Sequence, residues 1–308
     1  MATNTLEQSG ARYDEVLPPT AKEALKYLEL YARRRVDGIL HGAHSSKRVG
    51  VSTDFDHHKD YQPGDPLKHV DWKASARHDR FFVKRYLEDT SLTVRLVVDN
   101  SASMQQASNG TSKYLHACRV AGCLAYLVLK QNDQVGLALA TEDRTTWLPC
   151  SSRSTQLALI LRSLVTARRA ASDAVASALT TLLERVERRG IIALISDLMF
   201  NPAPVQRELG KLLSQGHETL IFQLRDPMEE DFPFSRWVQF HDLEDAAVRH
   251  RVDAVTLARI YRHEYQQLIE EWRQWAKDHN SHFVSMRTEE HVETVLSEYL
   301  SFRLKVAK

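Results

Sequence analysis

The sequence has few cysteines, no long apolar run and no excess of charge of one sign. Its three cysteines, Cys118, Cys123 and Cys150, lack the CxxC spacing of a zinc site and the density of a disulfide scaffold, so we expect buried free thiols. The longest apolar runs, 122–129 and 191–195, fall short of the roughly 18 to 20 residues that span a bilayer. We therefore predict no association with a membrane.

The charge balance excludes a globally basic protein. Lys+Arg total 41 and Asp+Glu total 40, a net charge of +1, so we expect no nucleic-acid partner. Residues 1–10 lack the cationic start and apolar middle of a secretory signal, which predicts a cytoplasmic protein. A chain of 308 residues has room for about two domains at roughly 150 residues each.

The first 90 residues divide into three predicted parts. Residues 1–19 read as a mobile tail that ends at two prolines, and a helix with a capping box at Thr20–Glu23 follows. Residues 41–79 have turn signals and no clear periodicity, so we expect an organised loop region. We predict a tail over 1–19, an N-terminal helix with loop and strand elaboration over 20–90, and a larger domain over 91–308.

The rest of the chain has the pattern of an α/β protein. Segments 82–86 and 92–98 are β-branched and aromatic, which favours a hairpin or neighbouring edge strands. Beyond them, apolar strands alternate with amphipathic helices, and this predicts a doubly wound, mostly parallel sheet with helices on both faces. The predicted helices are 113–130, 155–165, 174–188, 205–213, 253–277 and 291–302, and the predicted strands are 135–140, 191–195, 218–224, 237–240 and 282–285.

Oxygen-bearing side chains follow two of the apolar strands. Asp99, Ser101 and Ser103 come after one strand, and Asp197 comes after another. In a doubly wound sheet, ligands bind beyond the carboxyl ends of the strands, so these side chains are expected to meet there. An all-oxygen set suits Mg²⁺, with Mn²⁺ as an alternative. The competing interpretation is that Asp99 and Ser101 only cap the next helix.

The motif Asp99-x-Ser101-x-Ser103, with Asp197 after a later strand, resembles the metal-ion-dependent adhesion site of von Willebrand factor A domains. The flanking sequence is similar to the bacterial domain-of-unknown-function 58 family, and nearly the whole chain after the tail takes part. The segments that carry this resemblance are 50–55, 61–65, 70–77, 82–85, 133–137, 226–229 and 232–234.

The resemblance implies a von Willebrand A-like domain, a fifth metal ligand and a partner. The adhesion-site threonine would be Thr155, with Ser154 or Ser152 as alternatives. Family members are associated with MoxR-type AAA+ ATPases and are thought to act as adaptors in the assembly or maturation of other proteins. The resemblance thus implies a Mg²⁺ site formed by Asp99, Ser101, Ser103, Thr155 and Asp197 that captures an acidic residue of a protein partner.

Two other functions stay open from the sequence. A metal-dependent hydrolase would need a base beside the ion, and residues 99–104 contain neither His nor Glu. A metal-free structural scaffold would use the same oxygen atoms only to cap a helix. Asp56–His58 has the residue types of a phosphoesterase signature, but the match is three residues long and favours a solvated polar loop.

Overall fold

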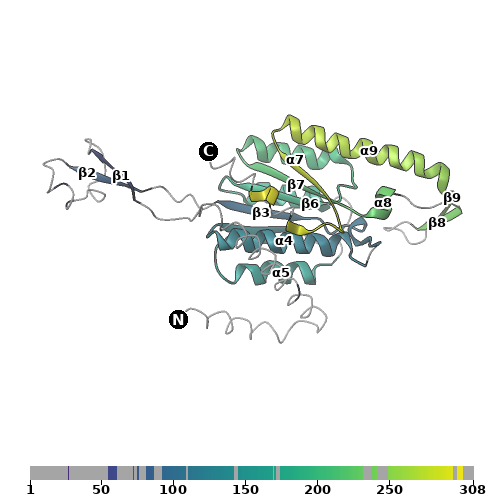
Figure 1. Ribbon diagram of the computed structural model, residues 1–308, viewed down its shortest axis with the longest axis horizontal. Coiled ribbons are helices and arrows are strands. Elements are labelled where there is room, and N and C mark those ends of the chain that lie inside the picture. The colour runs from purple at the N-terminus through teal and green to yellow at the C-terminus, as the bar shows by residue number, and fades with distance from the viewer. Residues whose placement is uncertain are drawn as a thin grey trace. The chain divides into compact units, whose positions relative to one another are not determined.

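The fold is described from a computed structural model of the protein (Figure 1). The chain divides into two compact units, Ser46–Ser91 and the remainder, Met1–Ser45 with Leu92–Lys308. The predicted tail over 1–19 and most of the predicted elaboration over 20–90 lie outside the described residues, so those boundaries stay a prediction. The described residues are 27, 55–60, 72, 75, 81–86, 92–108, 110–141, 145–168, 170, 174–231, 237–241, 249–293 and 297–300.

A six-stranded sheet forms the centre of the larger unit, in the order β10-β7-β6-β3-β4-β5. Every neighbouring pair is parallel except β4 with β5, which is antiparallel. β3 is the first of these strands in the chain, and the strand order reverses between β3 and β6. This is the pattern of a doubly wound α/β fold. The strands are β3 (Thr93–Val98), β4 (Gln134–Ala140), β5 (Thr145–Ser151), β6 (Ile191–Ser196), β7 (Glu218–Arg225) and β10 (His282–Arg287).

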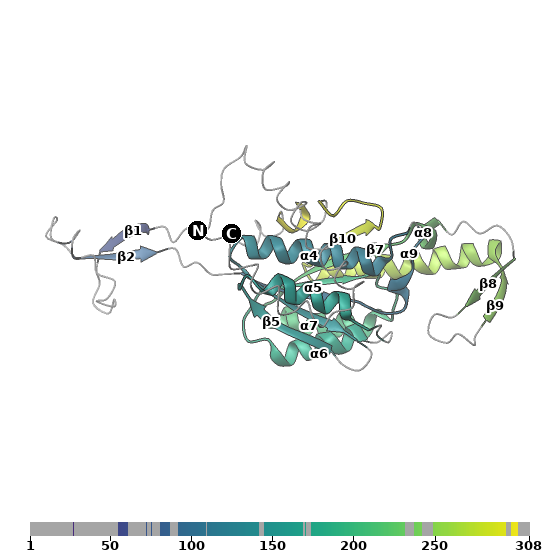
Figure 2. The same ribbon diagram turned by 90° about the horizontal axis from the view of Figure 1, so that it is seen from below.

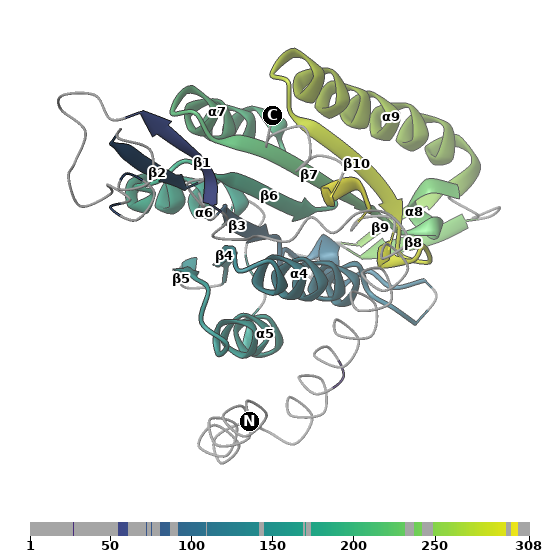
Figure 3. The ribbon, with the colours of Figure 1, turned by 60° about the vertical axis from the view of Figure 1, so that its left-hand side comes forward.

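Helices cover both faces of this sheet, as Figure 3 shows from its edge. One face packs against α4 (Lys113–Lys130) and α5 (Gln156–Thr166), which Figure 2 shows side by side. The other face packs against α6 (Ala174–Arg185), α7 (Pro202–Ser214) and α9 (Ala254–Asp278). The predicted doubly wound, mostly parallel sheet with helices on both faces is confirmed.

The alternation of side chains along each strand produces two cores. Leu96 of β3 belongs to the α4/α5 core, whereas its neighbour Val97 belongs to the α6/α7/α9 core. All six residues of β3 and all six of β6 are buried, as expected of central strands covered on both faces. Trp272 of α9 is fully buried in the second core.

Two short antiparallel pairs complete the described strands. β1 (Phe55–Asp60) pairs with β2 (Phe82–Tyr86), and β8 (Trp237–His241) pairs with β9 (Arg249–Asp253). The prediction of a hairpin or edge pair between 82–86 and 92–98 is therefore wrong: β2 pairs with β1, and β3 lies at the centre of the sheet. Asp56–His58 lies within β1, so the predicted loop there is also wrong.

Two short helices among the described residues are η3 (Ser103–Gln105) and α8 (Pro227–Asp231). Both follow directly on strands of the central sheet, η3 after β3 and α8 after β7. Within the described part of the chain, no helix combines the length and apolar character needed to cross a membrane. Cys118 and Cys123 are buried thiols outside any disulfide, as predicted, and Cys150 is a half-buried one.

Candidate metal-binding site

The candidate site lies where the two central strands of the sheet end. β3 and β6 are parallel neighbours with Val98 opposite Ile195, and the backbone N–H of Asp99 donates to the Ile195 carbonyl at 3.0 Å. Asp99 and Asp197 therefore follow adjacent strands at the point where the strand order reverses. In doubly wound sheets this point is where ligands bind.

Asp99 is buried and is held by two hydrogen bonds. Its Oδ1 accepts from the backbone N–H of Ser101 at 2.8 Å, and its Oδ2 accepts from the Ser196 hydroxyl at 2.6 Å. The Ser101 and Ser103 hydroxyl oxygens lie 3.1 Å apart. The chain turn after β3 thus brings the predicted residues Asp99, Ser101 and Ser103 together, and the hydroxyl of Ser196, which ends β6 just before Asp197, orients the Asp99 carboxylate.

Asp197 is bonded to a lysine from a different part of the chain. Its Oδ1 accepts from the backbone N–H of Met199 at 3.0 Å, and its Oδ2 accepts from Lys113 Nζ at 2.7 Å. Lys113 is the first residue of α4, and its ammonium also donates to Glu229 Oε1 of α8 at 2.5 Å. The side chains of Lys113 and Asp197 are 0% and 1% exposed, so this pair is closed to solvent.

A third strand of the sheet also ends at an aspartate. Asp226 follows β7, is fully buried, and accepts from the backbone N–H groups of Met228 and Ser108, each at 2.9 Å. The bond to Ser108 ties the loop after η3 to the start of α8. This contact fixes the loop that leads from the serine pair to Lys113.

Thr155 does not lie with the other four predicted ligands. β5 runs antiparallel to β4, so its last residue, Ser151, lies opposite Val135 near the start of β4. The side chain of Gln156, the next residue after Thr155, donates to the Val135 carbonyl at 2.9 Å. Thr155 is thus at the amino edge of the parallel strands, and its prediction as a fifth member of the cluster is wrong.

The alternatives Ser152 and Ser154 follow the same end of β5 and share the location of Thr155. The described loop that does approach Asp99 is the one after α5. There the backbone N–H of Ala170 donates to the Asn100 carbonyl at 2.9 Å, and Asn100 Nδ2 donates to the Arg168 carbonyl at 2.8 Å. Because β5 runs antiparallel, the loop before α5 lies at the amino edge of the sheet, and the loop after α5 lies near Asp99.

The site carries more negative than positive charge. Burial, and after it the nearby charge of Asp197, raise the pKa of Asp99 to about 6, against the opposing effect of hydrogen bonds from Ser196 and Ser101. Burial opposes the charge on Lys113, but Asp197 and Glu229 outweigh it and raise the pKa of the lysine. Asp197 and Glu229 share the ammonium of Lys113, and Asp99 beside them adds a further carboxylate, which favours a bound cation or a proton at Asp99.

The donor set fits a hard divalent cation. Asp99 and Asp197 supply carboxylate oxygens, and the facing hydroxyls of Ser101 and Ser103 supply neutral ones. Oxygen ligands and retained waters are what Mg²⁺ prefers. Among the residues that the structure describes, no three His, Cys, Asp or Glu side chains form a ligand group, so a cation here would depend on the serine hydroxyls and water.

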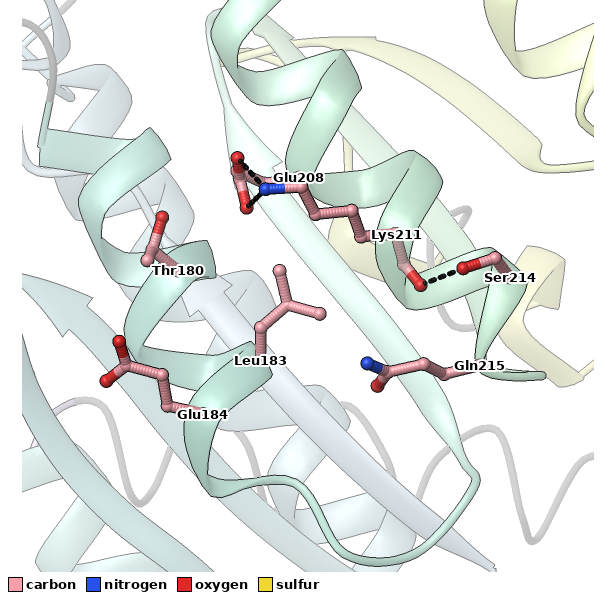
Figure 4. A pocket seen from close by; sticks show the side chains of 7 residues that line it. All are labelled: Thr180, Leu183, Glu184, Glu208, Lys211, Ser214 and Gln215. Atoms are coloured by element: carbon pink, nitrogen blue, oxygen red, sulfur yellow. Dashed lines mark hydrogen bonds and ion pairs between the residues drawn. The ribbon is translucent and has the colours of Figure 1, made fainter.

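A separate groove lies between α6 and α7, away from this site (Figure 4). These helices lead back to the starts of β6 and β7, so their last turns are at the amino edge of the sheet. Within the groove, Lys211 Nζ donates to Glu208 Oε1 at 2.8 Å. Its lining residues are Thr180, Leu183, Glu184, Glu208, Lys211, Ser214 and Gln215.

Comparisons with known proteins agree with the resemblance noted from the sequence. The chain is 29% identical to the uncharacterized protein Rv1480 of Mycobacterium tuberculosis over 234 residues, which cover 75% of this chain and 73% of that protein. It is 27% identical to the uncharacterized protein YeaD of Bacillus subtilis over 148 residues, covering 46% of this chain and 33% of that protein.

A solved structure also aligns with the fold. The conserved hypothetical protein BatB from Bacteroides thetaiotaomicron aligns with a TM-score of 0.47 and 16% identity, covering 70% of this chain and 99% of that one. Residues 57–274 match the family described as "Protein of unknown function DUF58". The chain belongs to the DUF58 family.

Proposed function

We propose that the protein is a non-enzymatic, metal-dependent protein-interaction module that works with a MoxR-type AAA+ ATPase in the assembly or maturation of other proteins. Mg²⁺, or Mn²⁺ in its place, would be held by Asp99, Ser101, Ser103 and Asp197. The observation that carries the proposal is the convergence of Asp99 and the Ser101–Ser103 hydroxyl pair with Asp197 at the carboxyl ends of two adjacent central strands.

The ligand chemistry supports binding of an acidic partner. A bound Mg²⁺ supplies a positive charge with a coordination position open to a carboxylate. Serine hydroxyls are neutral, so they hold an ion without cancelling its charge. Asp99 is fixed by Ser101 and Ser196, which orients its oxygens before any ion arrives. The chain's own residues would thus position a cation that attracts an Asp or Glu side chain of the partner.

The hydrolase alternative would need a free base beside the ion. Among the described residues, Glu229 and Asp226 bring further carboxylates to this region: Glu229 Oε1 is engaged by Lys113 at 2.5 Å, and both oxygens of Asp226 accept from backbone N–H groups. A base held in an ion pair is poorly suited to take a proton from water. Metal-dependent turnover of a phosphoester or peptide that disappears in Ser103→Ala would overturn the non-enzymatic proposal.

The proposal is tested by measuring the binding of a purified MoxR-type AAA+ ATPase from the same organism to the immobilised chain. The double variant Ser101→Ala/Ser103→Ala should lose at least about tenfold in affinity, since it removes the neutral ligands. The matched control is Thr155→Ala, a hydroxyl deletion at the opposite edge, which should bind like the unmodified chain. Equal binding by all three proteins would contradict the proposed use of this site.

A further inference from the structure

Lys113 places a fixed positive charge against one carboxylate of the candidate site. Its Nζ lies 2.7 Å from Asp197 Oδ2 and 2.5 Å from Glu229 Oε1, and its side chain is fully buried. A lysine at the first position of a helix is placed against the helix dipole, which favours negative charge there. The two ion pairs outweigh this local disadvantage and hold the ammonium beside the site.

The ammonium changes the charge that an incoming cation meets. Asp99, Asp197 and Glu229 carry three negative charges when ionised, the buried Asp226 beside Glu229 adds a fourth, and Lys113 offsets one of them. A divalent ion would offset two more. Without the lysine, the loaded site would be more negative and would repel an acidic side chain of a partner more strongly. Coulomb repulsion between Lys113 and the divalent ion also weakens the binding of the ion itself.

We infer that Lys113 is a positioning residue that holds Asp197 and lowers the affinity of the site for Mg²⁺, so that the metal-loaded site is less negative and accepts a carboxylate more readily. This inference rests on the proposed function. Glu229 has the opposite effect on Mg²⁺ affinity. It also accepts from the ammonium of Lys113, and so reduces the effect of that ammonium on Asp197. Both residues act through charge, and neither is assigned as a metal ligand.

The test is calorimetric titration of Mg²⁺ into chelator-stripped full-length protein. Lys113→Met, which keeps the length of the side chain and removes the charge, should bind Mg²⁺ at least about tenfold more tightly than the unmodified chain. Its melting temperature should also rise more on addition of Mg²⁺, because the ion replaces the missing countercharge. Unchanged or weaker Mg²⁺ binding by folded Lys113→Met would overturn the inference.

Glu229→Gln keeps the inference testable if Lys113→Met does not fold. Glu229 is 18% exposed, so its replacement by a neutral residue of the same shape is tolerated more easily than a change at Lys113. The ammonium is then left wholly to Asp197, and Mg²⁺ binding should weaken at least about threefold. Unchanged binding in this variant would contradict the role of the lysine.

The two proposals fail in distinguishable ways. If the unmodified chain binds Mg²⁺ and Ser101→Ala/Ser103→Ala does not, while Lys113→Met and Glu229→Gln bind like the unmodified chain, only the inference about Lys113 is wrong. If the unmodified chain, Lys113→Met and Glu229→Gln all bind neither Mg²⁺ nor Mn²⁺, the proposed metal site is wrong and the inference falls with it.

Discussion

The contributions of Lys113 and Asp197 to the unfolding free energy of the metal-free protein should depend strongly on each other. Both side chains are buried, at 0% and 1% exposure, and their atoms are 2.7 Å apart. Removing one partner of such a pair leaves an uncompensated buried charge, which costs about 3 to 5 kcal/mol of unfolding free energy. We expect this cost for Lys113→Met. Asp197→Asn should fall at the lower end of the range, because Glu229 still accepts from the ammonium.

The double variant Lys113→Met/Asp197→Asn should be much less damaging than the two single changes added together. It removes both charges, and replacing a buried pair by neutral side chains is often close to neutral in stability. We predict a coupling free energy of at least about 2 kcal/mol, within the range measured for residues in one network. For a unit of about 260 residues, each kcal/mol corresponds to about 2 °C in melting temperature.

The assay is urea unfolding of the four proteins with a chelator present, followed by circular dichroism and by tryptophan fluorescence. Coincident transitions by the two probes would justify two-state treatment. Additive effects of the single variants within about 0.5 kcal/mol would refute the reasoning, since independent sites behave in that way. Such a result would mean that the two charges do not depend on each other in the folded chain.

Three further predictions concern the body of the fold. Burial, reinforced by the charge of Arg119, lowers the pKa of His116 to about 4 from 6.5, so the unfolded chain binds the proton first as pH falls. Stability should then decrease from pH 6.5 to pH 4 by about 3 kcal/mol, and His116→Leu should abolish that part of the pH dependence in urea titrations. Trp272→Ala should cost about 3 to 5 kcal/mol in the same assay, because the side chain is fully buried against Phe200; a loss below 1 kcal/mol would contradict the packing. Burial raises the pKa of the Cys118 thiol to about 12, so iodoacetamide at pH 8 should modify it only after denaturation, as mass spectrometry would show.

The meeting of Asp99 and Asp197 could be predicted because it follows from short stretches of sequence. An apolar run such as β6 predicts a buried strand, and the residue that follows a parallel strand must lie at the carboxyl edge. For that reason Asp99 and Asp197 could be placed together from the sequence, and the structure puts them after neighbouring strands. Ser101 and Ser103 followed from their spacing in the same turn.

The direction of an edge strand was not predictable in the same way. β5 contains Pro149 and is at most half-buried, so its pattern does not distinguish a parallel from an antiparallel neighbour. Its antiparallel course moved Thr155 to the wrong edge for metal binding. The central position of β3 was missed for a related reason, since strand order depends on contacts between segments far apart in the chain.

The ion pairs of Lys113 were missed because a lysine at the start of a helix ordinarily lies in solvent. One signal was present: a basic residue in the first turn of α4, which contains no acidic residue, contradicts the helix dipole. A local rule broken next to a strand-end motif often marks a functional position. Glu229 and Asp226 carry a similar signal, because they follow the apolar strand β7.

The most direct test of the central claim is titration of Mg²⁺ into the chelator-stripped protein by calorimetry, beside Ser101→Ala, Ser103→Ala and Thr155→Ala. The account predicts saturable binding by the unmodified chain and by Thr155→Ala, and loss of binding in both serine variants while their circular dichroism is unchanged. Absence of Mg²⁺ and Mn²⁺ binding by the unmodified chain, or equal binding by the serine variants, would contradict the claim that these residues form a metal site.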